Sequence, residues 1–356
     1  AMSDRPIDSG MLSPAIPSPT PKKRRFAEPQ KFLPVIFVFS TIASLWAIYA
    51  VCHLLPLLQI GAWRPSGSVD EKVRTRGLQH CAIFHLITGM FVICYLRSIL
   101  TNPGGIPDND LQWEYLPEDG RHLSDWVPMG LQEMKKTGMR RHCKWCGKYK
   151  PDRTHHCRVC RTCILKMDHH CPWIYNCVGF ANYKFFFLLL FYSALDCHFI
   201  VWTMFESLRR CIDKPETHFA TMFFTLFGKT LAFFLSMLIT AFFGFHNMLM
   251  LKAMTTIEFC EKSWPRREGE CGRSYELSIY DAGWLGNIKA ILGDNVLLWF
   301  FPCSRPSGDG LNFVSEETRL TKDMESGKGI RRRTHQKAQR VQFHGRYDYS
   351  PTPFPR

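Results

Sequence analysis

The chain has 356 residues, of which 46% are hydrophobic, and a formal net charge of +14. Its length alone would suit a soluble two-domain protein, but the apolar residues gather in a few long stretches, which argues against that class. The charge could indicate nucleic-acid binding, yet the basic runs at residues 22–25 and 331–333 lie in Pro-, Ser- and Gly-rich ends. We favour attraction of these runs to anionic lipid, and predict no nucleic-acid partner.

Four nearly uncharged stretches are long enough to cross a membrane: residues 33–55, 78–100, 185–205 and 231–251. Each approaches or exceeds the roughly 20 residues that span the hydrocarbon core of a bilayer. None shows the alternating polar face of a surface helix. The first begins too far along the chain, and is too long, for a cleaved signal peptide. The sequence therefore predicts an α-helical, multi-pass integral membrane protein with four transmembrane helices.

The basic residues that flank the first span determine the predicted orientation. Residues 22–31 carry five Lys and Arg, whereas the loop at residues 61–77 carries four together with two acidic residues. The positive-inside rule therefore places the N-terminus in the cytosol, and four spans return the C-terminus to the same side. Span lengths of this order fit most endomembranes, so we expect the Golgi or the endoplasmic reticulum, with the plasma membrane as the alternative.

The loop between the second and third spans contains a dense cluster of potential metal ligands. Residues 143–177 hold seven of the 15 cysteines together with four histidines. In a cytosolic, reducing compartment these thiols stay free to bind metal, and C-x-x-C pairs are the common half-site of structural zinc modules. The segment has no apolar run to form its own core, so we predict that zinc folds it. Three such pairs are formed by Cys143, Cys146, Cys157, Cys160 and Cys163.

One cysteine of the cluster is a candidate for chemistry instead of metal binding. Two sites of three cysteines and one histidine each would leave one cysteine and two histidines over. Cys171 follows Asp168 and His169 closely, and an unligated thiol beside an imidazole is activated as a nucleophile. The three residue types match a nucleophile, a base and an acid that orients the base. Alternatively, Asp168 and His169 only orient zinc ligands, and spacing alone leaves both interpretations open.

The order of these residues resembles a known enzyme family. The pattern consists of Cys143, Cys146, Lys150, Pro151, Arg153, His155, His156, Cys157, Cys160, Cys163, Asp168, His169, His170, Cys171, Cys177 and Asn182. It resembles the cysteine-rich domain of the DHHC family of protein S-acyltransferases, or palmitoyltransferases. Asn102 stands where the family's Asp-Pro-Gly element usually has Asp. Residues 255–258 match its Thr-Thr-x-Glu element, and residues 280–293 resemble its C-terminal motif. The resemblance covers roughly residues 32–302.

The resemblance implies a role for each residue of the cluster. It implies one zinc ion held by Cys143, Cys146, His156 and Cys163, and a second held by Cys157, Cys160, His170 and Cys177. It also implies that Cys171 is the acylated nucleophile, His169 its base and Asp168 the partner of that base. His155 receives no implied chemistry. Both zinc ions would be structural, because protein ligands fill every coordination position.

The activity implied by the resemblance is protein S-acyl transfer. A long-chain acyl-CoA such as palmitoyl-CoA would acylate Cys171, and the acyl group would pass to cysteines of membrane-associated substrate proteins at the cytosolic membrane face. The rival interpretation is a catalytically silent, zinc-stabilised membrane scaffold, which would keep its function without Cys171. Trp173 suits either a place near the thioester or an anchor at the interface. Several basic residues of the loop suit CoA phosphates or lipid headgroups: Lys144, Lys148, Lys150, Arg153, Arg158, Arg161 and Lys166.

A charged residue inside the third span also needs an explanation, because such residues are costly in a membrane. One interpretation is that Asp196 is neutral, or paired within the bundle with His198 or Ser193. The family resemblance suggests instead that Asp196 lies at the end of the acyl cavity and shortens or polarises it. In the fourth span, we expect His246 and Asn247 to make hydrogen bonds between helices.

These observations divide the chain into six predicted regions. The two ends are predicted to be disordered. The cytosolic DHHC cysteine-rich zinc domain lies between the two helix pairs. The regions are a basic N-terminal tail (1–31), transmembrane helices 1 and 2 (32–100), the zinc domain (101–182), transmembrane helices 3 and 4 (183–251), a cytosolic juxtamembrane region (252–303) and a C-terminal tail (304–356).

Overall fold

The computed structural model describes six segments of the chain: residues 29–115, 131–135, 139–214, 216–263, 278–304 and 306–313. Nearly all of the predicted N-terminal tail and most of the predicted C-terminal tail lie outside these segments. The domain boundaries therefore stay predictions.

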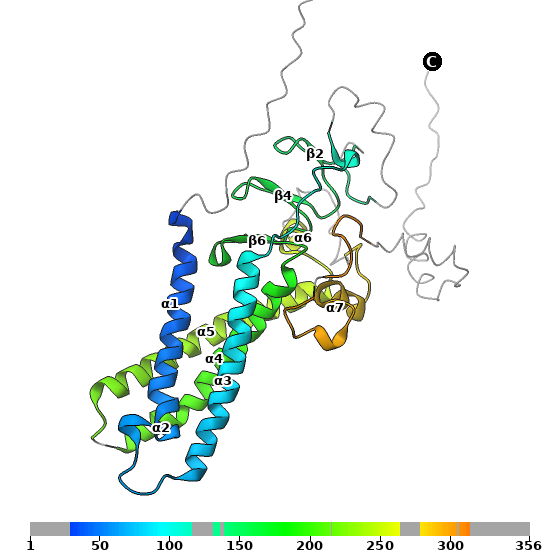
Figure 1. The fold of residues 1–356 in the computed structure, drawn as a ribbon. Coiled ribbons are helices and arrows are strands. Elements are labelled where there is room, and N and C mark those ends of the chain that lie inside the picture. Colours follow the sequence, from blue (N-terminus) through cyan, green and yellow to red (C-terminus); the bar gives the residue numbers. More distant parts are fainter. Residues whose placement is uncertain are drawn as a thin grey trace, which may run out of the picture.

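Four long helices form the body of the molecule (Figure 1). All four are long and apolar enough to cross a membrane, and they contain the four predicted spans. The predicted helical membrane fold, with a cysteine-rich unit between the second and third spans, is confirmed. The first helix is continuous from Leu33 to Leu58 but passes through one π-helical turn. The bounds are α1 (Leu33–Tyr49), the π-turn (Ala50–Leu54), α2 (Leu55–Leu58), α3 (Glu71–Leu100), α4 (Tyr183–Asp213) and α5 (Phe219–Leu251).

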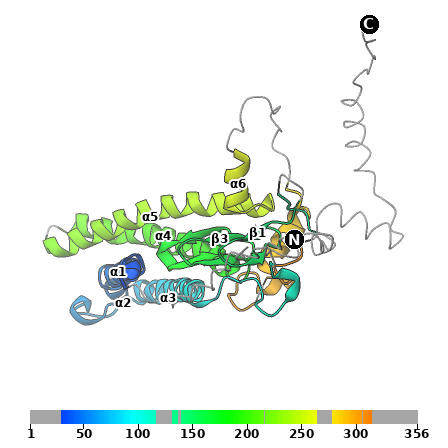
Figure 2. The same cartoon turned by 90° about the horizontal axis from the view of Figure 1, so that it is seen from above.

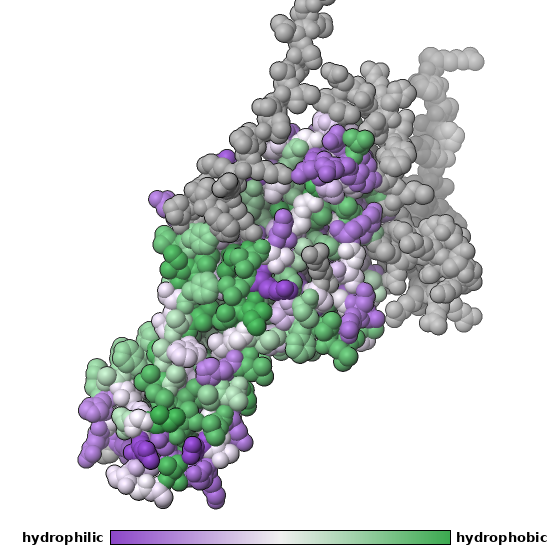
Figure 3. Space-filling model, in the orientation of Figure 1, coloured by the Kyte–Doolittle hydropathy of each residue, from purple (hydrophilic) through white to green (hydrophobic). Residues whose placement is uncertain are grey.

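The outward surface of the bundle suits a lipid environment. Figure 3 shows hydrophobic side chains over the middle of the bundle and hydrophilic ones at its lower end and around the strands. Large apolar side chains of α4 and α5 such as Trp202, Phe234 and Leu238 are exposed, as expected where lipid replaces water. The central helix is α4, because 61% of its most apolar 18-residue stretch is buried inside the protein, against 22% for the first span and for α5.

Polar side chains inside the bundle pair between helices. Tyr49 bonds to Thr203 at 2.8 Å, and the buried His53 bonds to Ser207 at 2.7 Å. The carboxylate of Asp196 accepts hydrogen bonds from Thr88 of α3 at 3.0 and 3.2 Å. Asp196 is therefore paired within the bundle, as one interpretation predicted, but its partner is Thr88 and not His198 or Ser193.

Asp196 does not pair with His198 or Ser193 because both of these side chains already have partners in their own helix. The side chains of His198 and Ser193 bond to carbonyl oxygens of their own helix, those of Ala194 and Leu190. They are thereby satisfied locally. The carboxylate of Asp196 cannot accept from a carbonyl oxygen, so it needs a donor, and Thr88 of the neighbouring helix supplies one.

Three short antiparallel hairpins follow the second span and stand over the end of the bundle when viewed from above (Figure 2). Each has strands of only two or three residues, which cannot build a core of their own. The pairs are β1 (His142–Cys143) with β2 (Lys148–Tyr149), β3 (His155–Cys157) with β4 (Thr162–Ile164), and β5 (His169–Cys171) with β6 (Asn176–Val178).

The last hairpin is fastened to the membrane helices. Asn176 donates to the carbonyl oxygens of Ser98 and Thr101 at the end of α3, both at 2.9 Å. Between β6 and α4, Gly179 leaves no room for a side chain, because a Cβ there would lie 2.6 Å from Ile164. The third hairpin is thus held between the ends of the second and third spans.

In the part of the chain that the structure describes, two shorter α-helices follow α5. The first, α6 (Thr256–Ser263), starts directly beyond the end of α5, and the second, α7 (Trp284–Leu292), packs against α4 and α5. Asn287 of α7 donates to the carbonyl oxygen of Leu251 at 2.9 Å. This bond satisfies a carbonyl group at the end of α5 that has no partner within the helix.

Candidate metal centres and active site

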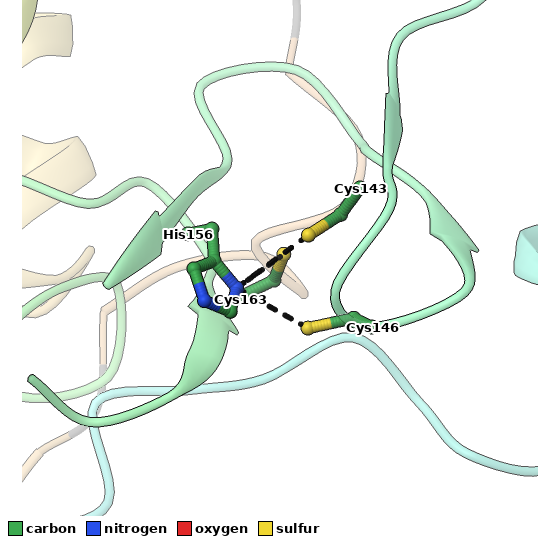
Figure 4. Close-up of side chains that lie close together, drawn as sticks. All are labelled: Cys143, Cys146, His156 and Cys163. Carbon is green, nitrogen blue, oxygen red and sulfur yellow. Dashed lines mark hydrogen bonds between the residues drawn. The ribbon is translucent and has the colours of Figure 1, made fainter. Parts of the chain in front are cut away.

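The first cluster of potential ligands joins two hairpins. Cys143 ends β1 and Cys146 lies in the turn that follows, where the backbone N–H groups of Cys146 and Gly147 both bond to the carbonyl oxygen of Cys143. His156 and Cys163 face each other across the second hairpin. Figure 4 shows the three thiols gathered around the imidazole of His156, whose Nδ1 lies 3.3 to 3.9 Å from the sulfurs.

The second cluster repeats this arrangement one hairpin further along. Cys157 and Cys160 come from the turn region of the second hairpin, and His170 and Cys177 face each other across the third. Nδ1 of His170 lies 3.5 to 3.7 Å from the three sulfurs. Neighbouring residues of a strand point to opposite faces, so His156 and Cys157 serve different clusters. Each hairpin is therefore linked to the next by shared ligation.

The geometry of both clusters fits zinc. In each, the four candidate ligand atoms lie within 4.8 Å of one another. Zinc bonds of about 2.3 Å to sulfur and about 2.1 Å to nitrogen place tetrahedral ligand atoms roughly 3.6 Å apart. The separations from Nδ1, 3.3 to 3.9 Å, centre on that value. The structure thus assembles both predicted ligand sets, and three thiolates with one imidazole are a donor set that zinc prefers.

Cys171 lies outside both clusters within the described part of the chain. Strand alternation places His170 on the metal side of β5 and His169 and Cys171 together on the other. The side chain of Cys171 is buried in an apolar cluster that includes Ile174 and residues of the first, second and third spans. The predicted nucleophile and base therefore share one face of a strand, at the end of the helix bundle.

A buried carboxylate orients the imidazole of His169. Oδ2 of Asp168 lies 2.7 Å from Nδ1 of His169, so Nε2 is left for Cys171. Burial opposes the charged form of His169, but hydrogen bonds to Asp168 and Cys171 outweigh it and raise the pKa of His169 to about 9. Burial would likewise raise the pKa of Asp168, yet the bond from His169 holds that pKa below its usual value.

The start of α6 holds the other side of Asp168. Thr256 donates to Asp168 through its backbone N–H at 2.9 Å and through its hydroxyl at 2.7 Å. Thr255 and Glu258 fix this helix end with a reciprocal capping box: the backbone N–H of each bonds to the side chain of the other, at 2.9 and 3.2 Å. The sequence contained this Thr-x-x-Glu signature, but its contact with Asp168, 88 positions earlier, was not predicted.

A buried ion pair ties α6 to the hairpins. Arg153 donates to both carboxylate oxygens of Glu258, at 2.7 and 2.9 Å, and to the carbonyl oxygen of Ala253 at 3.0 Å. Only 4% of the Arg153 side chain and 13% of the Glu258 side chain are exposed. Burial works against the Glu258 charge, but the Arg153 guanidinium lowers the pKa of Glu258 below its usual range.

This pair corrects one sequence interpretation. Arg153 is buried and neutralised, so it does not belong to the basic surface proposed for CoA phosphates or headgroups. Lys148 is also engaged, with Asp108 at 2.8 Å and with two carbonyl oxygens. Among the candidates, Lys144, Arg158 and Arg161 remain exposed.

A second histidine lies beside His169, the predicted base of the Cys171–His169 dyad. The ring of His246 in α5 is 6.0 Å from that of His169, and its Nδ1 is 3.1 Å from the hydroxyl of Tyr183 in α4. The expected interhelical bond of His246 is confirmed, whereas Asn247 bonds within its own helix, to Phe243. Among the described residues, Nε2 of His246 has no hydrogen-bond partner.

Comparison with known proteins identifies the family. The DHHC palmitoyltransferase family matches residues 136–263. Palmitoyltransferase ZDHHC20-B of Danio rerio is 32% identical over 299 residues, 79% of this chain and 82% of its own length. Palmitoyltransferase ZDHHC15 of Mus musculus is 33% identical over 301 residues, 79% of this chain and 81% of its own length. The chain belongs to the DHHC palmitoyltransferase family.

Membership of the DHHC family confirms the predicted enzyme class, a protein S-acyltransferase, over the scaffold alternative. ZDHHC20 of Homo sapiens shows the same extent of similarity, with 33% identity over 79% of this chain and 76% of its own length.

Replacing Thr256 with Val should slow acylation of this DHHC protein without unfolding it. The hydroxyl that donates to Asp168 is lost, and a hydrogen bond to a charged group is worth about 1.5–3 kcal/mol, or roughly 10- to 150-fold in rate. The measurement is the single-turnover rate of acyl-enzyme formation, with zinc content recorded alongside. Thr256→Ser, which keeps the hydroxyl, is the matched control. An unchanged rate in Thr256→Val would show that the contact with Asp168 is only structural.

Proposed function

We propose that this DHHC palmitoyltransferase moves a long-chain acyl group from acyl-CoA to Cys171, and from Cys171 to cysteines of membrane-associated proteins. One observation carries the proposal: Cys171 shares a strand face with His169, outside both metal clusters, while Asp168 orients the imidazole. Both zinc ions, held by the ligand sets described above, would fix the hairpins that carry this dyad.

In the first step, the proton of the Cys171 thiol passes to Nε2 of His169. The thiolate attacks the thioester carbonyl of acyl-CoA and forms a new carbon–sulfur bond. The bond from that carbon to the CoA sulfur then breaks, and the CoA thiolate takes the proton back from His169. Asp168 holds the required tautomer and stabilises the imidazolium.

In the second step, His169 accepts the proton of a substrate cysteine, whose thiolate attacks the acyl-Cys171 thioester. The acyl group moves to the substrate, and the Cys171 sulfur leaves and recovers its proton from His169. One thioester is exchanged for another at each step, so no further energy source is required.

The position of Cys171 supports a reaction at the membrane surface. An acyl chain gains about 0.8 kcal/mol for each CH₂ that it buries in hydrocarbon, whereas the CoA headgroup carries phosphates and stays in water. Cys171 packs among residues of the spans at the end of the bundle where the hairpins stand. We place this end on the cytosolic side, where thiols stay reduced and where the flanking basic residues orient the protein.

The test separates the two steps. Full-length protein would be acylated with palmitoyl-CoA, freed of CoA compounds, and then mixed with a cysteine peptide anchored to vesicles. We expect the peptide to gain the label at the rate at which the protein loses it. Loss of label to water alone, with none on the peptide, would contradict transfer through the acyl-enzyme.

We further propose that Asp196 limits the length of the acyl chain. It lies about 20 Å along α4 from Tyr183, at a depth that the far end of a chain anchored on Cys171 would reach, and its carboxylate is held there by Thr88. Asp196→Leu should raise the use of an acyl-CoA two methylenes longer than palmitoyl-CoA by about tenfold relative to palmitoyl-CoA. The check is competition between the two donors. Asp196→Asn, which stays polar, is the control, and an unchanged ratio in Asp196→Leu would refute the idea.

A further inference from the structure

The segment after α7 exposes an unusual amount of apolar surface. We call residues 293–304 the C-terminal loop; it contains the short 3-10 helix Val296–Leu298. Leu297 is 82% exposed, and the other outward side chains of the loop are about half exposed. Exposed apolar side chains gathered on one short segment are typical of surfaces that contact a membrane or another protein. The outward side chains of the loop are Val296, Leu297, Phe300 and Phe301.

The loop does not lie above the membrane helices but beside them. The hydroxyl of Tyr192 donates to the carbonyl oxygen of Phe300 at 2.7 Å, and the ring of Phe191 packs against that of Phe300 at 5.5 Å. Tyr192 lies about 13 Å along α4 from its first residue. Figure 1 shows the same placement, with the loop descending from α7 alongside the upper part of α3 and α4.

Several backbone carbonyl groups of the C-terminal loop face the helices, whereas the side chains of Asp294 and Asn295 are exposed where the loop begins. The fully buried Lys184 donates to the carbonyl oxygens of Leu292 and Leu298, at 2.9 and 2.7 Å, and to the hydroxyl of Ser304. Arg97 of α3 donates to the carbonyl oxygen of Pro302 at 2.7 Å. Non-helical backbone is tolerated at membrane depth only where protein satisfies its polar groups, and these contacts provide that.

We propose that the C-terminal loop is inserted into the lipid leaflet on the side of the hairpins, with lipid acyl chains as its partner. The loop packs against residues of α3 and α4 at a depth where the outward faces of those helices meet lipid, so its own outward face continues their surface. Its apolar run, residues 296–301, is much too short to span a membrane. It therefore enters and leaves on the same side. This inference does not depend on the chemistry of Cys171.

The test places a fluorescent amino acid at one position of the full-length protein, reconstituted in phosphatidylcholine nanodiscs. The test position is Leu297, 82% exposed. Leu238 of α5, 68% exposed, is the lipid-facing control, and Leu111, 76% exposed in the 3-10 helix Leu111–Trp113 beside the hairpins, is the aqueous control. Bromine atoms on the lipid acyl chains quench probes in the bilayer, and iodide quenches probes in water.

We expect the probe at position 297 to lose most of its emission with brominated lipid and little with iodide, as at position 238. Bromines near the headgroup should quench position 297 more than bromines near the chain end, and the order should reverse at position 238, which lies near the middle of α5. Quenching by iodide, as at position 111, would place the loop in water. Quenching by neither agent would show that protein, such as a second copy of the chain, covers it. Either result would overturn the proposal.

Discussion

Replacing Asp168 with Asn is expected to slow acyl transfer by about four orders of magnitude, as loss of the orienting carboxylate does in hydrolase triads. Oδ2 of Asp168 accepts from Nδ1 of His169 at 2.7 Å. An amide at this position presents an N–H group or stabilises the wrong tautomer, so Nε2 of His169 can no longer take the proton of Cys171. The measurement is the single-turnover rate of acyl-enzyme formation.

Asp168→Asn also decides between the two roles that spacing left open for Asp168: orienting the base His169, or orienting zinc ligands. If Asp168 served only to orient zinc ligands, Asp168→Asn would lose zinc and stability together with activity. In the structure, the side-chain oxygens of Asp168 bond to His169 and Thr256, neither of which belongs to a cluster. We therefore expect two zinc ions per chain to remain. A variant that keeps more than about a tenth of the wild-type rate would contradict the orienting role.

Removing one cluster ligand should have the largest effect on stability. In His156→Ala, we expect the zinc content to fall from two ions per chain to one or fewer, and the hairpins to unfold. The strands are two or three residues long, so metal binding supplies most of their folding energy, and structural zinc in small modules is worth about 10–16 kcal/mol. Because His156 and Cys157 are neighbours on β3, loss of the first site should also weaken the second.

The neighbouring histidine is the matched control. His155 lies on the same strand and belongs to neither cluster among the described residues, so His155→Ala should keep two zinc ions. Elemental analysis gives the zinc content, and limited proteolysis of the hairpins reports their folding. Retention of two zinc ions by His156→Ala would show that the ligand set is wrong.

Spans and candidate metal ligands could be predicted because their signals are local. A long apolar run is the spanning signal itself, and ligands three residues apart approach one ion whatever the rest of the chain does. The division of ligands between two sites came from the family resemblance. The structure supplies its physical cause: His156 and Cys157 point to opposite faces of one strand, as do His170 and Cys171.

Contacts between distant segments could not be predicted in this way. The sequence predicts Arg153 as one of the basic residues suited to phosphates or headgroups, because nothing near it in sequence indicates its contact with Glu258, 105 positions later. The bond of Asp196 to Thr88 depends on how α3 packs on α4. Four spans predict a cytosolic position for residues 252–303, and only contacts such as that of Tyr192 with Phe300 show that the loop after α7 lies beside the membrane helices.

One labelling experiment tests most directly whether Cys171 is the nucleophile. Purified, zinc-loaded wild type and Cys171→Ser would be exposed in detergent to a long-chain acyl-CoA that carries a clickable tag. We predict hydroxylamine-labile label on wild type alone, with two zinc ions on each protein. Equal labelling of both proteins, or none on either with zinc intact, would contradict acyl transfer through Cys171.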